Sequence, residues 1–167
     1  MADIQYNFIN LPSRIEFENG HVISYLYDAD GIKLRTTHII GSDTTVTDYC
    51  GNVIYENGIP VKLLTEAGYV TLADSKYHYF VQDHLGNNRV VVDQSGNVEE
   101  VNHYYPFGGL LSSSVSNAVQ PYKYNGKELD RKNGLDWYDY GARMYDAALG
   151  RWHAVDPMSE KYYSWSP

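Results

Sequence analysis

The residues of this sequence that could hold a metal ion are His78, Asp83, His84 and His103. Zinc sites usually pair their ligands a few residues apart along the chain, and these four residues lack that paired spacing. His78 also lies between Tyr77 and Tyr79, so on a strand it faces away from both rings. The spacing therefore predicts no metal site, and we expect no cofactor.

Cys50 is the single cysteine of the chain, so it has no partner for an internal disulfide. Nothing near it in the sequence indicates the electropositive pocket that would activate a thiol. We expect Cys50 to be a small, buried or half-buried apolar residue. The sequence also lacks a glycine-rich phosphate loop, a Gly-x-Ser-x-Gly elbow and an Asp-Thr/Ser-Gly triplet, which argues against several common enzyme classes.

Aromatic side chains are the other candidates for function, because 17 tyrosines help to bring the aromatic content to 14%. Rings on the face of a sheet can stack on the rings of a sugar, and the candidates are Trp137, Tyr138, Tyr140 and Trp152. On an extended strand, Trp137 shares one face with Leu135, and Tyr138 shares the other face with Tyr140. Such residues either form the core of a packed unit or bind carbohydrate.

Turn signals organise the elements that would position these side chains. Asn-Gly and Asp-Gly pairs favour turns with a positive φ angle, and they occur at 19–20, 30–31, 57–58, 125–126 and 133–134. Between about residues 20 and 110, such signals recur roughly every ten residues, a spacing that leaves room for strands but not for helices. The segments between them alternate or are rich in β-branched residues: 15–17, 21–27, 32–35, 59–64, 77–81 and 89–92. One weak helical turn is expected near 127–131.

A tyrosine-aspartate turn recurs along the chain. In its first copy, the aspartate can bond the turn backbone and a later glycine can adopt a positive φ angle. The residues of the copies are Tyr27, Asp28 and Gly31, then Asp83 and Gly86, then Asp93 and Gly96, and finally Tyr145, Asp146, Gly150 and Arg151. The sequence therefore predicts an all-β fold, an antiparallel β-hairpin meander that forms an open, curved sheet.

These turns and the motifs of the C-terminal third resemble the RHS/YD-repeat family. The motifs are Asp83–Arg89, His103–Gly108, Tyr124–Glu128, Arg143–Asp146, Gly150–Trp152 and Asp156–Pro157. Together they are similar to the RHS repeat-associated core domain in its Bacteroidetes-type form. The resemblance implies a sheet that winds into a hollow shell around a C-terminal toxin or effector, with the core region closing the shell.

The resemblance also implies a division of the chain. We expect a YD-repeat β-hairpin sheet over 1–107, a linker or loop over 108–120, and a compact aromatic C-terminal core unit over 121–167, or else one continuous domain. A sheet of this kind has at least one unprotected edge, through which it could associate with itself.

In toxin-type members of the family, the core region cuts the chain by an aspartyl mechanism, and the matching residues here are Arg143 and Asp156. That mechanism needs two carboxylates that share one proton. Glu160 is the one carboxylate after Asp156 and matches nothing in the motif, and Ala147 replaces the usual proline. We therefore expect no enzyme in the chain as given, with self-cleavage confined to a longer chain and Asp156 serving as a turn or cap residue that pairs with Arg143.

Charge and hydropathy narrow the partners. A net charge of −8 with scattered basic residues argues against nucleic acid, and no window approaches a membrane span. The N-terminus has neither the basic nor the apolar region of a signal peptide, so we expect this chain to encode no secretory signal of its own. The family resemblance implies that it is secreted or displayed at the cell surface as part of a larger exported protein. The expected partners are the remainder of the shell and the C-terminal effector.

The function predicted from these observations is a structural one. The chain is expected to be a scaffold segment of an RHS-repeat shell, involved in encapsulating and delivering a toxin or effector. Two alternatives stay open at this point: an incomplete aspartyl autoprotease core that needs a second downstream aspartate, and a carbohydrate-binding β module.

Overall fold

The computed structural model describes residues 3–112, 114–116 and 120–161. Within these ranges the strands form two antiparallel sheets, one of 12 strands and one of four. In both sheets every strand pairs with the strand that precedes or follows it in the sequence. The predicted all-β meander is confirmed. Residues 113 and 117–119 of the predicted linker and residues 162–167 of the predicted C-terminal unit lie outside the described residues.

The long sheet is a run of hairpins in chain order. Its strands are β1 (Asp3–Tyr6), β2 (Pro12–Glu16), β3 (Val22–Tyr27), β4 (Lys33–Ile40), β5 (Asp43–Cys50), β6 (Val53–Glu56), β7 (Ile59–Thr65), β8 (Gly68–Thr71), β9 (Lys76–Gln82), β10 (Asn88–Asp93), β11 (Val98–Val101) and β12 (Val115–Ser116). The register shifts between Gln5 and Tyr6, Leu26 and Tyr27, Ile54 and Tyr55, and Val91 and Val92. Such bulges add twist and bend the strand that carries them.

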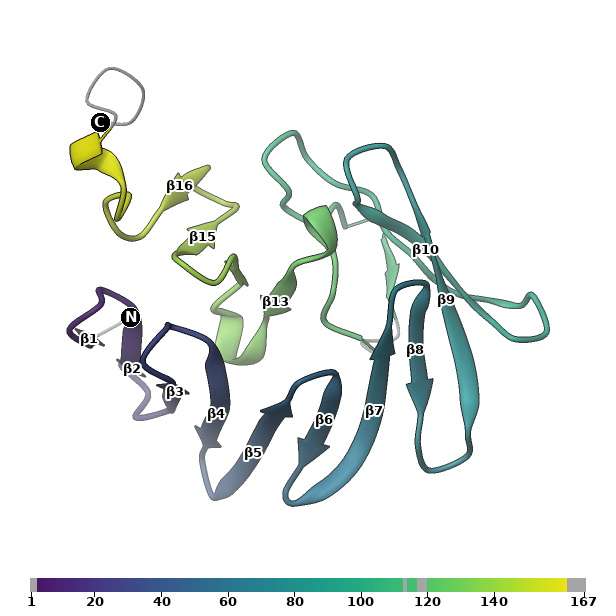
Figure 1. Ribbon diagram of the computed structural model, residues 1–167, viewed down its shortest axis with the longest axis horizontal. Helices are drawn as coiled ribbons and strands as arrows, with labels where there is room; N and C mark the ends of the chain where they lie inside the picture. The colour runs from purple at the N-terminus through teal and green to yellow at the C-terminus, as the bar shows by residue number, and fades with distance from the viewer. Residues whose placement is uncertain (1–2, 113, 117–119, 162–167) are drawn as a thin grey trace.

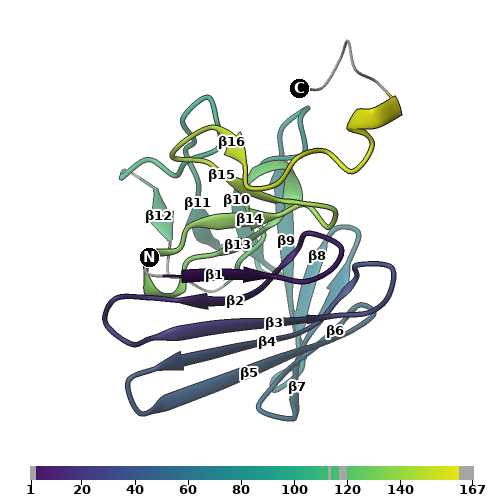
Figure 2. The same cartoon turned by 90° about the vertical axis from the view of Figure 1, so that its left-hand side faces the viewer.

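The short sheet comprises β13 (Glu128–Asp130), β14 (Trp137–Asp139), β15 (Met144–Asp146) and β16 (Arg151–Trp152). Three 3₁₀ turns accompany it: η1 (Tyr124–Gly126), η2 (Lys132–Gly134) and η3 (Ser159–Lys161). Figure 1 shows the long sheet as an arc with β13, β15 and β16 on its concave side. In Figure 2 the short sheet is drawn above β1, with β2–β5 following below β1. We call the long sheet the wall and the short sheet the insert.

The hydrophobic core lies between the wall and the insert. Ile15, Ile23 and Tyr25 of the wall pack with Trp137 and Met144 of the insert, and all five are buried. The core therefore contains residues from both segments into which the sequence was divided. The segment predicted as a linker also takes part in the wall, because it carries β12, which pairs with β11.

The two faces of the wall differ in exposure. His78 on β9 is 5% exposed, whereas its neighbours Tyr77 and Tyr79 are 49% and 42% exposed. This alternation follows from the two-residue period of a strand and confirms that His78 faces away from the two tyrosines. On β9, therefore, the face that carries His78 is covered, and the face that carries the two tyrosines meets solvent.

Two local expectations were wrong. The segment near 127–131 is strand β13 rather than a helical turn, because Glu128, Leu129 and Asp130 pair with β14. Cys50 is exposed rather than buried. It is the last residue of β5, directly before Gly51, and a side chain at a hairpin tip has few neighbours to cover it. Within the described ranges, no helix is long and apolar enough to span a membrane.

The core makes a prediction about Trp137, which is 1% exposed between the two sheets. Trp137→Ala should lower the free energy of unfolding by about 3–5 kcal/mol, because it removes a large buried side chain and leaves a cavity. Chemical denaturation followed by circular dichroism measures this loss. Trp152→Ala is the matched control, since Trp152 is 41% exposed and should lose about 1 kcal/mol. Equal losses in the two variants would contradict the placement of the core.

Candidate functional site: repeated loops and a polar seam

A five-residue hairpin loop recurs seven times among the described residues, at 7–11, 17–21, 28–32, 83–87, 93–97, 105–109 and 123–127. In each loop the first N–H donates to the fifth carbonyl, and the fourth N–H donates to the first carbonyl. The fourth residue always has a positive φ angle, between 59° at Asn10 and 88° at Gly108. In six of the loops this is the geometry of a type I turn followed by a bulge at the positive-φ residue, which reverses a strand in three residues. The loop 123–127 differs, because its third residue, Asn125, also has a positive φ angle of 50°.

The aspartates of the tyrosine-aspartate turns stabilise three of these loops. The Oδ1 atom of Asp93 accepts the N–H groups of Ser95 (2.8 Å) and Asn97 (2.9 Å). Asp28 and Asp83 accept the third and fifth N–H groups of their own loops in the same way. The carboxylate thereby satisfies two backbone donors that a short loop leaves without partners.

The sequence reading missed one loop of this type. Asn7 accepts the N–H groups of Ile9 and Leu11, so it replaces the aspartate, and Asn10 replaces the glycine. The sequence did contain a turn signal here, the two asparagines, because asparagine adopts a positive φ angle more readily than most residues that have a side chain. The last predicted turn differs: Asp146 accepts the N–H groups of Ala148 and Leu149, in a loop that is longer before Gly150.

Hydrogen bonds shift the titration of two loop aspartates. The Asn97 side chain and backbone N–H groups lower the pKa of Asp93 to about 2. The Asn87 side chain lowers the pKa of Asp83 further, with contributions from backbone N–H groups and Arg89. Both loops therefore favour the ionised carboxylate.

A polar seam joins the insert to the wall. We define it by the acids of the insert, Glu128, Asp130 and Asp139, and by the wall residues that contact them, Tyr25, Lys33, His38 and Tyr49. The Nζ atom of Lys33 lies 2.7 Å from carboxylate oxygens of both Glu128 and Asp139. Tyr49 donates its hydroxyl to Glu128 at 2.7 Å. One lysine on β4 thus pairs with two acids that come from two strands of the insert.

Asp130 forms the second half of the seam. Its carboxylate accepts the Tyr25 hydroxyl at 2.9 Å and lies 3.0 Å from Nε2 of His38. Burial acts to raise the pKa of Asp130, but the hydrogen bond and charge of His38 and the Tyr25 hydroxyl lower it below its ordinary value. Burial acts to lower the pKa of Lys33, yet the charges of Glu128 and Asp139 raise it well above its ordinary value. The seam is therefore built from charges that stabilise each other.

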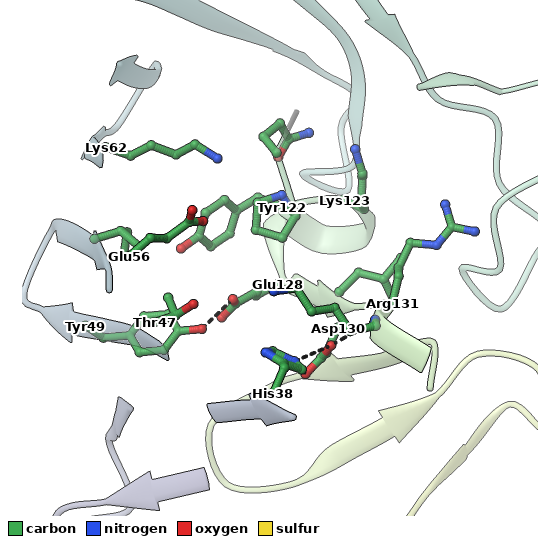
Figure 3. Close-up of a pocket in the computed structure, with 15 residues that line it drawn as sticks. His38, Thr47, Tyr49, Glu56, Lys62, Tyr122, Lys123, Glu128, Asp130 and Arg131 are labelled. Atoms are coloured by element: carbon green, nitrogen blue, oxygen red, sulfur yellow. Dashed lines mark hydrogen bonds and ion pairs between the residues drawn. The ribbon is translucent and has the colours of Figure 1, made fainter. Parts of the chain in front are cut away.

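A cleft of about 340 Å³ opens beside the seam, between strands β4–β7 and the segment 120–132. Figure 3 shows Lys62, Glu56 and Tyr122 pointing into it, with Lys123 on the far side. Burial lowers the pKa of Lys62, an effect that the nearby charge of Glu56 opposes. The cleft therefore carries both signs of charge on an otherwise covered face of the wall.

The structure brings the predicted pair Arg143 and Asp156 together. The Nη2 atom of Arg143 donates to Oδ2 of Asp156 at 2.8 Å, and Met158 N–H donates to Oδ1. Ser159 N–H donates to the Asp156 carbonyl. Asp156 thus caps a turn and pairs with Arg143. The guanidinium also lies over the Trp152 ring, 4.4 Å from its centroid.

The four predicted stacking residues differ in how far their side chains are buried. Trp137 and Tyr138 are buried, at 1% and 0% exposure, and Tyr138 donates its hydroxyl to the Gly108 carbonyl. Tyr140 and Trp152 meet edge to face, with ring centroids 5.0 Å apart. Two of the four rings therefore belong to the core, and the other two contact each other.

Two of the residues considered as metal ligands, His78 and Asp83, are bonded to other partners. His78 bonds Thr71 at 2.9 Å and Glu99 at 2.5 Å, within the wall. Asp83 binds its own loop and Arg89. Across the described part of the chain, no three histidine, cysteine, aspartate or glutamate side chains form a group that could hold a metal ion.

The fold and these contacts define a class of protein: a β-meander wall built from tyrosine-aspartate loops, with a C-terminal sheet placed inside its curve. Residues 62–165 match the family described as the teneurin YD-shell, and the chain belongs to this family. It is a structural segment of a YD-repeat shell. The predicted membership of the RHS/YD-repeat group is confirmed, and the Bacteroidetes-type assignment stays a prediction.

Known relatives agree with this assignment. Salivary gland surface protein 1 of Aedes aegypti is 30% identical over 177 residues, covering 91% of this chain and 5% of that protein. Toxin subunit YenC1 of Yersinia entomophaga is 30% identical over 128 residues, covering 66% of this chain and 13% of that protein. The chain therefore corresponds to a small part of the proteins it matches.

Solved structures share the fold. The crystal structure of TcdB2-TccC3-Cdc42 superposes with a TM-score of 0.77 at 19% identity, over 93% of this chain and 9% of that one. A structure of the Photorhabdus luminescens Tc holotoxin pore gives a TM-score of 0.76, with the same identity and coverage. Wall and insert together are thus a known arrangement.

The seam predicts that Lys33 is essential for docking of the insert. Lys33→Met should lower the free energy of unfolding by about 3–5 kcal/mol, because Glu128 and Asp139 are left buried without their cation. Arg35→Met is the matched control on the same strand. Arg35 pairs with Asp48 while its side chain is 51% exposed, so its loss should change stability far less than the loss of Lys33. Urea denaturation of both variants tests this, and similar small losses would contradict the role of the seam.

The loop aspartates predict a loss of stability in acid. Because the pKa of Asp93 is lowered in the folded state, its stabilising effect is present above the unfolded pKa, about 3.9, and is lost as the pH falls through about 2. The Tm measured from pH 5 to pH 2 should therefore fall less steeply in Asp93→Asn. Asp30→Asn, at an exposed position of an equivalent loop, is the control and should keep the wild-type slope. An unchanged slope in Asp93→Asn would refute the assignment.

Proposed function

We propose that this chain forms the closing end of a hollow β-shell that encloses a toxin or effector polypeptide carried by the same larger protein. The observation that carries the proposal is the position of the insert on the concave side of the wall (Figure 1). An insert at that position fills the inside of the curve and narrows the space at this end of a shell. The seam gives it one fixed position, because its largely covered acids each have a partner on the wall.

The relatives support an enclosed toxin. YenC1 and YenC2 are named toxin subunits, and they match 66% and 40% of this chain. One of the similar solved structures is described as TcdB2-TccC3 without its hypervariable C-terminal region. We infer that this chain precedes a variable passenger in a longer protein, that the remaining shell completes the wall, and that the whole protein is exported to the cell surface or beyond.

We propose a non-catalytic role for the segment itself. The carboxylate oxygens of Asp156 are bonded to Arg143 and to the Met158 N–H, which suits a turn that ends the insert. Self-cleavage, in this proposal, requires a second carboxylate supplied by a longer chain.

Protease protection of a passenger tests the enclosure. A reporter domain replaces the passenger in the full-length protein, and its digestion is followed by gel electrophoresis. The reporter should be protected in the wild-type protein and digested in Ile23→Asp, because Ile23 is 0% exposed and a buried charge there displaces the insert. Leu26→Asp is the matched control on the same strand, since Leu26 is 55% exposed on the convex face and its variant should stay protected.

Two outcomes would contradict the proposal. Digestion of the reporter in the wild-type protein, at the rate seen for the free reporter, would exclude enclosure. A fragment that accumulates from this 167-residue chain, but not from its Asp156→Asn variant, would exclude the non-catalytic role.

A further inference from the structure

A second buried polar cluster lies behind the cleft, where β11 meets the segment that leads into η1. It consists of Glu100 on β11, Asn102 just after β11, and Gln120 and Lys123. These residues are 1%, 1%, 3% and 2% exposed. A lysine that is covered to this extent is rare, and its ammonium is stable only if a partner compensates for lost water.

One carboxylate oxygen organises the cluster. Oε1 of Glu100 accepts Nζ of Lys123 at 2.5 Å, Nε2 of Gln120 at 2.9 Å and Nδ2 of Asn102. The amine of Lys123 and the carboxamide of Asn102 therefore lie no more than two hydrogen bonds apart. Asn102 Nδ2 also donates to the Asn88 carbonyl at 3.0 Å, which fixes the orientation of the carboxamide.

Two oxygens of the same cluster have no hydrogen-bond partner. They are Oε2 of Glu100 and Oδ1 of Asn102, and both are buried. Two acceptors cannot satisfy each other unless one of them carries a proton. A proton moved from Lys123 to Glu100 would make the carboxyl group a donor and leave Lys123 as a neutral amine. Burial favours this state, since it lowers the pKa of Lys123 despite the charge of Glu100.

We propose that Lys123 and Asn102 form an intramolecular isopeptide bond, with Glu100 as the group that moves the protons. The neutral amine of Lys123 attacks Cγ of Asn102, and the protonated Glu100 donates its proton to Oδ1 as the carbonyl electrons move there. The resulting carboxylate takes a proton from the attacking nitrogen and passes it to Nδ2. The Cγ–Nδ2 bond then breaks, Oδ1 returns its proton to the Glu100 carboxylate as the carbonyl reforms, and ammonia leaves.

The reaction needs no oxidant, metal or second substrate, because an amine and a carboxamide give a substituted amide and ammonia. Burial contributes by holding the two groups together and by excluding water, which would compete for Cγ. The cleft supplies an exit for ammonia, because Gln120 and Lys123 both line it. The new bond would close the chain between 102 and 123 and fix the junction of wall and insert covalently.

Asn102 is a better acyl donor than Gln120 in this geometry. Its Nδ2 donates both to Glu100 and to the Asn88 carbonyl, and it follows the strand that carries Glu100 by one residue. Gln120 is held through its Nε2 by Glu100 and lies only three residues from Lys123, so a bond between them would close a small ring.

Mass spectrometry of the whole chain tests the proposal without any variant. The wild-type protein should be lighter than its sequence by one ammonia, about 17 Da, and a tryptic digest should contain one branched peptide that joins Lys123 to Asn102. Glu100→Gln and Lys123→Arg should each have the full sequence mass. Lys33 is an internal control, since it is a buried lysine that pairs with carboxylates, and its peptides should be recovered without a cross-link.

Three results would overturn the proposal. They are a wild-type chain with its full sequence mass, a branched peptide that joins Lys123 to Gln120, and a cross-link that persists in Glu100→Gln. If Glu100→Gln does not fold, the mass of the wild-type chain and the identity of its branched peptide still decide the question.

Discussion

The structure depends on covering the concave face of a single-layer sheet. A meander of 12 strands has two faces, and one layer cannot remove either of them from water. The concave face carries Ile15 and Ile23, both 0% exposed, because β13–β16 pack over them. Among the described residues, side chains of the convex face such as Leu26 and Tyr77 remain about half exposed. The insert is thus what makes the wall a folded body with a core.

The contact between wall and insert is partly charged, and this has a structural consequence. Glu128 and Asp130 are two residues apart on β13, so both face the wall, while Leu129 between them faces the other way. Each acid must meet its own partner on β4, Lys33 or His38. An apolar contact tolerates sliding, but a displaced carboxylate would be buried without a cation. The seam therefore fixes the register of the insert on the wall, which a closing element needs.

The wall is held together by contacts between residues close in sequence, whereas the insert is attached to it by contacts between residues far apart in sequence. In the wall, every strand pairs with its neighbour in sequence, and a five-residue loop can reverse the chain by itself. The seam joins residues that are far apart in sequence: 105 residues for Tyr25 and Asp130, and 95 for Lys33 and Glu128. The buried cluster of Glu100, Asn102 and Lys123 lies between these extremes and fixes the segment that crosses from the wall to the insert.

The sequence by itself determined the all-β class, the meander and the family, because hairpin loops are short-range structures. Asp28, Asp83 and Asp93 each accept backbone N–H groups of their own loops, so this role is visible within a few residues. Asn7 could have been found in the same way. The pairing of Arg143 with Asp156 could also be predicted from the sequence, because the two residues lie thirteen positions apart within one family motif.

The tertiary structure decided the rest, because burial depends on which segments meet across the fold. It placed Trp137 and Tyr138 in the core although their spacing suits a binding face equally well. It also turned Glu128–Asp130 into a strand, by pairing it with β14. Neither the seam nor the buried cluster around Glu100 could be predicted from the sequence. An acid or a lysine in a polar stretch gives the same sequence pattern whether it is exposed to solvent or paired in the interior.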